Sequence, residues 1–328
     1  MSNKKKILIV QNIHSSGIKL LQNHPNFEFE ILHSEEMIET IEPNLFKKKI
    51  ENCDGITIKT ENLPGEIINS AKKLKIISRH GVGYDNIDLE CTKKNNITLA
   101  ITATANAASV AEHVMFMVLS IAKKKNMYDD SVRTGKFSIR NKLPKTIEIW
   151  KKNFLIVGFG RIGQSLIKRC LGFEMNVFVY DPYVERKKIE NFGGKKVDDF
   201  KAAVKEMDII SIHMPLNEKT KNLINLELLK TMKKNCILIN AARGGIINES
   251  DLFEALSNNY IFGVGLDVFN IEPPEKNNPL LNSDKVFLSP HSATFTEECT
   301  ERMSVETVQN IIDFFDKKLE KFKTVELK

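Results

Sequence analysis

The sequence predicts an α/β protein built from two doubly wound parallel-sheet domains. Short apolar runs of strand length alternate with segments whose apolar residues recur at helical spacing, both before and after residue 100. Only the second of these stretches carries a glycine-rich turn, Gly158-Phe159-Gly160-Arg161-Ile162-Gly163. The 328 residues, 42% of them hydrophobic, are enough for two cores.

The first domain is predicted from strands that alternate with helices. The apolar runs predict strands at 7–10, 27–32, 55–58 and 75–78, with helices at 18–23, 45–51 and 65–71. This alternation indicates a parallel sheet covered on both faces. Residues 109–124 are predicted to form a long helix. The polar segment 128–150, with Gly135 and Pro144, is predicted to be an irregular connection.

The second domain repeats the alternation around the glycine-rich turn. Strands are predicted at 154–157, 177–180, 208–212, 236–240, 262–266 and 286–288, with a helix at 249–256. A helix after the turn is predicted from the apolar residues Ile162, Leu166, Ile167 and Leu171. The last stretch, 297–319, repeats apolar residues at helical spacing, and its pattern alone assigns it to neither domain.

The glycine-rich turn favours a dinucleotide site over an ordinary strand-to-helix turn. Gly158 allows the turn, Gly160 lets the backbone approach a pyrophosphate, and Gly163 lets the helix pack on the strand. Arg161 and Ile162 open the helix, whose N-terminus attracts phosphate. Asp181 ends the next strand, where a carboxylate accepts ribose hydroxyls and repels a 2′-phosphate. We therefore expect NAD, although the basic residues 186–188 just beyond leave NADP open.

Composition excludes several other classes of protein. The net charge of +6 is scattered, with no basic stripe interleaved with aromatics, so no nucleic-acid partner is expected. Five widely spaced cysteines predict neither disulfides nor a metal site. The longest apolar stretch, 107–122, is interrupted by Glu112 and His113, so we expect no membrane span and no membrane partner. A cytoplasmic protein is expected.

Three polar side chains follow predicted strands of the second domain, at the sheet edge where ligands bind. Arg243, in Ala242-Arg243-Gly244-Gly245, has a planar fork that suits a carboxylate, and the alternative is a surface ion pair. His291 suits acid/base transfer, and the alternative is a structural histidine. Glu272, before two prolines, would hold the tautomer of His291 if the two side chains pair; taken singly it is a turn residue.

The chain resembles the D-isomer-specific 2-hydroxyacid dehydrogenase family over about residues 4–316. The resemblance rests on motifs in matching order: Gly81-Val82-Gly83-Tyr84-Asp85-Asn86-Ile87-Asp88, Ser109-Val110-Ala111-Glu112-His113, Asn240-Ala241-Ala242-Arg243-Gly244-Gly245, Gly265-Leu266-Asp267-Val268-Phe269, Glu272-Pro273-Pro274, and Ser289-Pro290-His291-Ser292-Ala293. The chain departs from the family pattern at 150–153, where a glycine is usual, and at Tyr84, which is bulkier than usual.

The resemblance implies roles for these residues. Arg243 would bind the substrate carboxylate and carbonyl, and His291 would be the acid/base with Glu272 as its partner. Asp267 would lie near the nicotinamide carboxamide, while His213 and Pro215 would flank the adenosine. The family fold implies a Rossmann domain at 102–293 inserted in a flavodoxin-like substrate domain formed by 1–101 and 294–328, with the cleft between them.

Within the family the chain resembles a short form of the phosphoglycerate dehydrogenase branch without C-terminal regulatory domains. Lys59 and Arg79 follow neighbouring predicted strands, so both cations would face one anion. The branch implies that they bind the substrate phosphate, and that the backbone at Val82 and Gly83 receives its carboxylate. The alternative is a solvated Lys59 and an Arg79 paired with Asp85 or Asp88.

The resemblance thus predicts NAD-dependent, reversible conversion of a D-2-hydroxyacid to its 2-oxoacid, with 3-phosphoglycerate and serine biosynthesis favoured. A glyoxylate/hydroxypyruvate reductase or a sulfolactate-type dehydrogenase is the enzymatic alternative. A NAD-sensing, corepressor-like binding protein is the alternative from another class. We also expect a homodimer or homotetramer, as is common in the family, with the apolar helix around 110–121 as a candidate interface.

Overall fold

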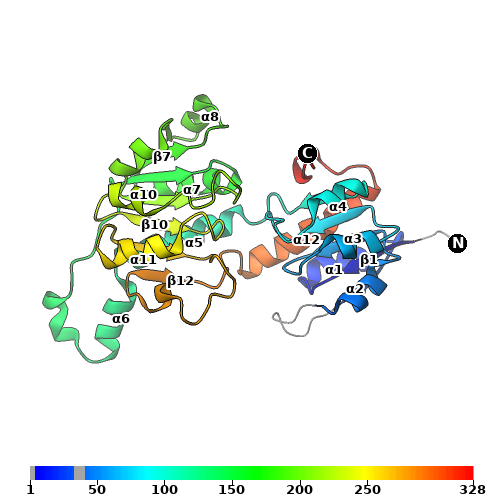
Figure 1. Ribbon diagram of the computed structural model, residues 1–328, viewed down its shortest axis with the longest axis horizontal. Coiled ribbons are helices and arrows are strands. Elements are labelled where there is room, and N and C mark those ends of the chain that lie inside the picture. Colours follow the sequence, from blue (N-terminus) through cyan, green and yellow to red (C-terminus); the bar gives the residue numbers. More distant parts are fainter. Residues whose placement is uncertain (1–3, 33–40, 328) are drawn as a thin grey trace. The chain divides into compact units, whose positions relative to one another are not determined.

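The computed structural model describes residues 4–32 and 41–327 (Figure 1). Contacts divide the chain into two compact units. Unit 1 comprises Met1–Asn106 and Phe295–Lys328, and unit 2 comprises Ala107–Thr294. The expected junctions, after residues 101 and 293, fall close to these, and the last helix belongs to unit 1.

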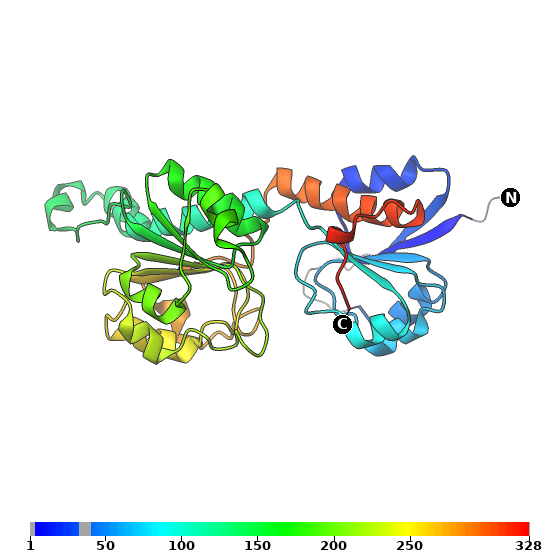
Figure 2. The ribbon, with the colours of Figure 1, turned by 90° about the horizontal axis from the view of Figure 1, so that it is seen from above.

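Unit 1 is a parallel sheet covered by helices on both faces. Its strand order is β2 (Phe27–Ile31), β1 (Lys5–Ile9), β3 (Gly55–Ile58), β4 (Ile76–Arg79), β5 (Thr98–Ile101). Helices α1 (Ser15–Gln22) and α12 (Glu297–Phe315) cover one face, and α2 (Pro43–Ile50), α3 (Gly65–Ser70) and α4 (Leu89–Lys94) cover the other (Figure 2). The order 2-1-3-4-5 is flavodoxin-like.

The alternation of side chains along β1 explains the two cores of unit 1. Successive residues of a strand point to opposite faces. Ile7 and Ile9 pack with Ile311 of α12, whereas Leu8 and Val10 pack with residues of α2 and α3. Because this strand is buried on both faces, its sequence is a continuous hydrophobic run and not an alternation of apolar and polar residues.

Unit 2 is a larger parallel sheet, again with helices on both faces. Its strand order is β12 (Val286–Leu288), β11 (Gly263–Leu266), β10 (Ile237–Asn240), β9 (Ile209–Ile212), β6 (Asn153–Val157), β7 (Asn176–Tyr180), β8 (Lys195–Lys196). Helices α5 (Ala107–Ala122), α7 (Arg161–Gly172) and α8 (Arg186–Asn191) pack on one core. Helices α9 (Phe200–Ala203), α10 (Leu226–Thr231) and α11 (Glu249–Ser257) pack on the other.

Counted from β6, the order of unit 2 is 3-2-1-4-5-6 with one further strand, which is the Rossmann arrangement. All strand pairs within the described sheets are parallel. The predicted fold class, two doubly wound domains of Rossmann and flavodoxin-like type, is therefore confirmed.

Three local predictions were wrong or incomplete. The segment expected to be irregular contains helix α6 (Lys125–Arg133) and the 3-10 turn η1 (Phe137–Lys142). The helix was missed because it is mostly polar and has too few apolar residues to show a helical period in the sequence. Figure 1 shows α6 leading away from the sheet of unit 2. Other elements were not predicted, namely strands β5 and β8 and helices α4, α8, α9 and α10. Leu171 was expected on the apolar face of the helix after the glycine-rich turn, but it is 37% exposed, and its neighbour Cys170 is buried in the core instead.

Among the described residues, no helix is long and apolar enough to cross a membrane. No group of three or more His, Cys, Asp or Glu in that part of the chain is placed to hold a metal ion. The five cysteines are free thiols.

Candidate active site

Neighbouring strands of unit 2 end at one level, and this edge gathers the predicted site residues. Pairing sets Val157 opposite Ile212, Ile212 opposite Asn240, Asn240 opposite Leu266, and Leu266 opposite Leu288. The next residue of each strand therefore emerges at the same carboxyl edge: Gly158, His213, Ala241, Asp267 and Ser289. In open α/β sheets this is the edge where ligands bind.

The glycine loop between β6 and α7 fits a dinucleotide. Gly158 has φ +99°, and a Cβ there would lie 2.5 Å from the carbonyl oxygen of His213. A Cβ on Gly163 would lie 2.5 Å from the carbonyl oxygen of Gly158, so only glycine allows this packing of helix on strand. A Cβ on Gly160 would meet nothing within 4 Å. The backbone at Gly160 is therefore open to a ligand.

Helix α7 begins at Arg161 without a side-chain cap, since Gly160 occupies the N-cap position. By contrast, Asn248 caps α11 and Thr296 caps α12 with side-chain hydrogen bonds. The first N–H groups of a helix have no acceptor within the helix, and at α7 no capping side chain supplies one. A pyrophosphate at this N-terminus would supply it, and the helix dipole favours its charge.

Asp181, at the end of β7, shapes the glycine loop directly. Its Oδ2 accepts the N–H of Phe159 (2.8 Å), and its Oδ1 accepts the N–H of Tyr183 (2.9 Å). Each carboxylate oxygen keeps a lone pair for a ribose hydroxyl. Nearby, Arg186 donates to Asp198 and to the carbonyl of Lys196 (3.1 Å). That cation is thus engaged with groups of the protein other than Asp181.

His213, after β9, is held from below by Ser211, whose hydroxyl lies 2.8 Å from His213 Nε2. Burial lowers the pKa of His213 to about 3, so the ring is neutral at physiological pH. Its Nδ1 is buried without a hydrogen-bond partner among the described residues. Pro215 is exposed, and its carbonyl accepts the Thr220 hydroxyl at 2.7 Å. Both residues stand beside the loop where an adenosine is expected.

The structure brings Glu272 and His291 together. His291 Nδ1 lies 2.7 Å from Glu272 Oε2, and Glu272 Oε1 accepts the N–H of Phe269 at 3.0 Å. Burial raises the pKa of Glu272, but the hydrogen bond and charge of His291, the Phe269 N–H and Arg243 outweigh it, so that pKa is lowered. An ionised Glu272 requires the proton on Nδ1 of His291. The other ring nitrogen, Nε2, is then the one that exchanges protons with a ligand.

Arg243 lies in a loop that packs against the segment leading to Glu272. A Cβ on Gly244 would lie 1.8 Å from the carbonyl oxygen of Phe269, so this loop approaches that segment as only glycine allows. Asn240 fixes the loop by accepting from the N–H of Ala242 (3.1 Å) and donating to the carbonyl of Arg243 (2.8 Å). Arg243 Nη1 donates to the carbonyl of Ala242 at 2.6 Å. Its charge also helps lower the pKa of Glu272.

Asp267, after β11, is 1% exposed, and both of its oxygens hold the segment that carries His291. Oδ1 accepts the Ser289 hydroxyl (2.6 Å) and the N–H of Ser292 (2.8 Å), and Oδ2 accepts the N–H of Ala293 (3.0 Å). His291 itself has φ +51°, a left-handed conformation. Asp267 therefore clamps the chain on both sides of this strained residue.

Unit 1 carries the second predicted cluster, Lys59 and Arg79. Ile58 and Arg79 are opposite each other in the β3–β4 register, so Lys59 follows one strand beside the end of the next. Burial and the charge of Arg79 both lower the pKa of Lys59. His80 is 5% exposed, and neither ring nitrogen has a hydrogen-bond partner among the described residues. Burial, Lys59 and Arg79 lower the pKa of His80 to about 3.

The loop after β4 is shaped around the Arg79 side chain. Gly81 has φ +145°, and a Cβ there would lie 2.7 Å from Arg79 Nη1, so glycine gives the guanidinium its room. Arg79 donates to the carbonyl of His80. Val82 is 37% exposed, and Gly83 follows it at the surface of unit 1. Asp88, one alternative partner of Arg79, caps α4 through the N–H of Cys91 (2.9 Å).

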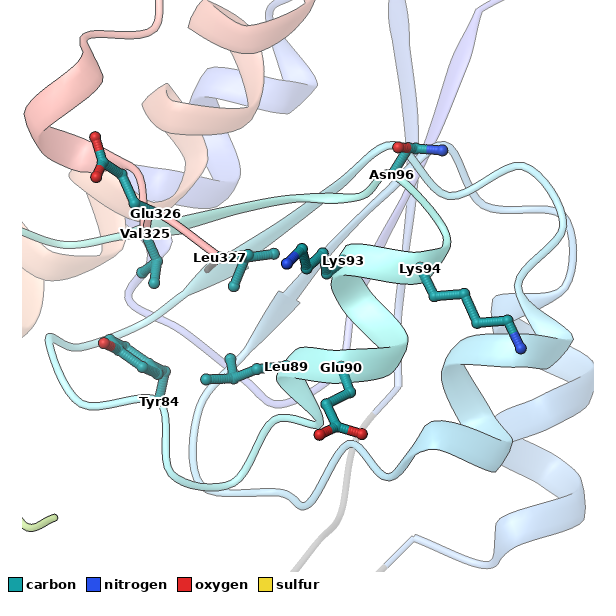
Figure 3. A pocket seen from close by; sticks show the side chains of 9 residues that line it. All are labelled: Tyr84, Leu89, Glu90, Lys93, Lys94, Asn96, Val325, Glu326 and Leu327. Atoms are coloured by element: carbon teal, nitrogen blue, oxygen red, sulfur yellow. The ribbon is translucent and has the colours of Figure 1, made fainter. Parts of the chain in front are cut away.

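A pocket of about 780 Å³ lies behind this loop, within unit 1. Figure 3 shows Tyr84 of the loop, Leu89 and Lys93 of α4, and Leu327 of the C-terminal segment around it. The C-terminal segment is fixed there by a bridge between Ala100 and Thr324. The bulky Tyr84 is thereby accommodated in the same apolar core as Leu327.

Residues 115–293, more than half of the chain, match the model of the D-isomer specific 2-hydroxyacid dehydrogenase NAD binding domain. The chain belongs to the D-isomer specific 2-hydroxyacid dehydrogenase family. The matched segment lies within unit 2, which holds the glycine loop and the Glu272–His291 pair.

The relatives of this chain are named for different enzyme activities. It is 38% identical over 89% of its length to a D-3-phosphoglycerate dehydrogenase of Methanocaldococcus jannaschii, of which it spans only 54%. It is 36% identical to a Hydroxypyruvate reductase of Thermotoga maritima, over 86% of this chain and 92% of the relative. A D-lactate dehydrogenase from Aquifex aeolicus, solved with NAD and lactic acid, has a TM-score of 0.83 at 27% identity, covering 97% of this chain and 98% of that one.

Two residues that the structure brings to the site, His113 and Ser289, had no role in the prediction from sequence. His113 of α5 lies 2.9 Å, through Nε2, from the hydroxyl of Ser289. Ser289 in turn donates to Asp267. The signal was present, because His113 interrupts an apolar helix, and a buried polar group needs a partner.

Proposed function

We propose that the protein catalyses NAD-dependent hydride transfer between a D-2-hydroxyacid and its 2-oxoacid. The observation that carries the proposal is the Glu272–His291 pair, 2.7 Å apart, at the sheet edge that also presents Arg243 and the glycine loop. An imidazole whose Nδ1 is held by an ionised carboxylate is an acid/base, and a nearby guanidinium suits a carboxylate substrate.

The groups of the chain have separate tasks in this proposal. Arg243 binds the substrate carboxylate and orients the carbonyl or hydroxyl carbon. In reduction, His291 Nε2 donates a proton to the carbonyl oxygen; in oxidation, neutral His291 takes the hydroxyl proton. Glu272 keeps the second ring nitrogen, Nδ1, protonated and stabilises the imidazolium form. When bound, the nicotinamide supplies or accepts the hydride.

The cofactor would be held by residues whose geometry fits it. Gly158, Gly160 and Gly163 leave room for a pyrophosphate, and the first N–H groups of α7, with Arg161 and Ile162, face it. Asp181 keeps lone pairs for the ribose hydroxyls, and His213 and Pro215 border the adenosine. Asp267 Oδ2 accepts the N–H of Ala293 and has a second lone pair that could receive the carboxamide.

We further propose that the substrate carries a second anionic group, as 3-phosphoglycerate and phosphohydroxypyruvate do. Lys59 and Arg79 are two cations beside buried, neutral His80. Burial and then the charge of Arg79 lower the pKa of Lys59, and an anion bound between the two cations would offset that repulsion. The backbone at Val82 and Gly83 would receive the carboxylate. The name of the D-3-phosphoglycerate dehydrogenase relative supports this substrate. A role in serine biosynthesis is part of the same proposal.

The second candidate is a reductase of hydroxypyruvate or glyoxylate, or a sulfolactate-type dehydrogenase. It is favoured by the hydroxypyruvate reductase relative, of which the chain spans 92%. Such substrates share the oxoacid group that Arg243 and His291 would bind. They differ in the group that would meet Lys59 and Arg79.

One experiment separates these substrates: NADH oxidation with phosphohydroxypyruvate, hydroxypyruvate and glyoxylate, in wild type and in Arg79→Ala. We expect phosphohydroxypyruvate to have the highest kcat/KM, and Arg79→Ala to remove most of its advantage. Losing a charge-assisted contact costs about 1.5–3 kcal/mol, which is roughly 10- to 150-fold in kcat/KM. Lys94→Ala is the control, because Lys94 of α4 points away from Tyr84 and the loop (Figure 3).

The same assay tests the alternative from another class. A NAD-sensing binding protein would bind NADH without oxidising it in the presence of any of these oxoacids. Equal kcat/KM for hydroxypyruvate and phosphohydroxypyruvate, with Arg79→Ala affecting both alike, would instead support the reductase.

We propose that the protein self-associates through the surface of α6 and η1. Met127, Val132 and Phe137 are 39%, 57% and 63% exposed there, and contact with a second copy of the chain would remove these apolar side chains from water. Light scattering after size exclusion should give at least a dimer, and Val132→Glu with Phe137→Glu should lower the mass.

The free cysteines are compatible with a cytoplasmic, reducing environment.

A further inference from the structure

The side chains of His113, Ser289 and Asp267 form a buried chain of hydrogen bonds behind the segment that carries His291. His113 belongs to α5, whereas Ser289 and Asp267 follow strands β12 and β11. Nε2 of His113 lies 2.9 Å from Ser289 Oγ, and Ser289 Oγ lies 2.6 Å from Asp267 Oδ1. The side chains of His113 and Asp267 are 15% and 1% exposed, so water does not replace these contacts.

The direction of each hydrogen bond in this chain follows from counting protons. Asp267, an acceptor only, takes the single hydroxyl proton of Ser289. Ser289 then has no proton to offer His113, so Nε2 of His113 must be the donor. Burial lowers the pKa of His113, although the charge of Asp267 opposes this, and the ring is neutral at physiological pH. Neutral His113 is therefore the Nε2–H tautomer.

The chain of hydrogen bonds ends on the catalytic segment. Asp267 receives the N–H groups of Ser292 and Ala293, on the far side of His291 from Ser289. His113 Nε2 also lies 3.5 Å from Asp267 Oδ1, so it places a further positive dipole beside this buried carboxylate. Removing the donor takes from the Ser289 oxygen the hydrogen bond that it accepts, and takes from Asp267 the positive dipole beside it. Losing such interactions is costly for buried acceptors.

We infer that His113 is a positioning residue, which acts through Ser289 and Asp267 to hold His291 in its left-handed conformation with Nε2 toward the substrate. The inference rests on the proposed function, because it assigns His291 the acid/base role. His113 touches neither substrate nor cofactor in this assignment. Its ring packs beside Phe116, whose ring contacts Phe287 of β12, so α5 holds the histidine in place.

The first test is kinetic. His113→Leu keeps an apolar volume but loses the donor, and kcat should fall on the order of 10- to 100-fold, because a small displacement of a reacting group is that costly. KM for the oxoacid and the Kd of NADH should change little. His113→Gln, whose amide can donate from a similar position, should restore most of the rate. Ser289→Ala combined with His113→Leu should cost no more than the larger single effect.

A matched control comes from the same helix. Met115→Leu alters a buried side chain of α5 that contacts Cys170 and not Ser289, so it measures the effect of disturbing helix packing alone. A wild-type kcat in His113→Leu, or a loss equal to that of Met115→Leu, would overturn the inference. So would a failure of His113→Gln to exceed His113→Leu.

The second test is independent of turnover. Nitrogen-15 NMR of histidine-labelled wild-type protein should show His113 as the Nε2–H tautomer at neutral pH, and His113→Gln should leave the signals of His291 near their wild-type positions. A His113 protonated at Nδ1 alone would overturn the proton count even if His113→Leu does not fold. If wild-type protein fails to oxidise NADH with every oxoacid tested, the proposed function is wrong. The NMR measurement would still test the hydrogen bonds of His113, Ser289 and Asp267 in that case.

Discussion

Replacing Glu272 by glutamine removes the negative charge that faces His291 Nδ1 at 2.7 Å while keeping the size of the side chain. The glutamine must also serve the N–H of Phe269, which Glu272 Oε1 now accepts at 3.0 Å. Its single oxygen cannot satisfy both donors. Either the imidazolium loses a charged acceptor, or the amide NH₂ faces Nδ1 and favours the wrong tautomer. Both outcomes weaken the protonated form of His291.

The magnitude follows from the kind of hydrogen bond that is lost. A hydrogen bond to a charged group contributes about 1.5–3 kcal/mol and a neutral one about 0.5–1.5 kcal/mol, a difference of roughly 1–1.5 kcal/mol. The side chains of His291 and Glu272 are 52% and 37% exposed, so solvent screening brings this difference to the low end of that range.

The assay is the pH dependence of kcat/KM for NADH oxidation with the best oxoacid. Reduction needs protonated His291, so activity falls as pH rises, and Glu272→Gln should move that alkaline limb to lower pH. The rate at the optimum should also fall by about 10²-fold or more. Glu275→Gln, an exposed acid on the same loop, should leave the profile in place. A profile in Glu272→Gln that matches wild type would remove Glu272 from its assigned role.

Four further outcomes are expected. Asp181→Ala should weaken NAD binding and raise the ratio of kcat/KM for NADP to that for NAD; equal use of both cofactors by wild type would refute the NAD assignment. Gly163→Ala should lower the thermal midpoint, at a cost of about 1–3 kcal/mol, since its Cβ would lie 2.5 Å from a backbone oxygen. Lys151 has φ +57°, so Lys151→Gly should be more stable than Lys151→Ala by about 1 kcal/mol in denaturant unfolding; equal stabilities would contradict this. Folding lowers the pKa of His80 from 6.5 to about 3, so the unfolded state binds a proton on this residue at a higher pH than the folded state does. The free energy of unfolding should therefore fall as the pH drops from 6.5 toward 3. It should fall less steeply in His80→Phe, which has no group to protonate.

The elements with a strong apolar period were predictable from sequence, and those without one were not. Strand β3 and strand β12 were predicted with their observed bounds, because each is a short apolar run flanked by polar residues. Helix α6 was missed because its side chains face solvent and only Ser131 is buried. Tertiary contacts, which a local pattern does not contain, decide such segments.

The sequence indicated which residues to inspect at the candidate site, but it did not indicate the contacts between them. Strand ends placed Arg243 and His291 at one edge, because parallel strands share a carboxyl end, whereas Asp267 was expected only from the family resemblance. The distance between Glu272 and His291 could not follow from spacing, since a loop separates them. The hydrogen bonds of His113 depend on where α5 crosses the sheet, and the left-handed conformation of Lys151 is set by the turn that leads into β6.

The central claim, that this chain moves hydride between NAD and an anionic 2-hydroxyacid, is tested most directly by one steady-state measurement. Wild-type protein is mixed with NADH and either phosphohydroxypyruvate, hydroxypyruvate or glyoxylate, and the loss of NADH absorbance is followed. We predict turnover with all three and the highest kcat/KM for phosphohydroxypyruvate. Saturable NADH binding without oxidation by any of the three would contradict the claim.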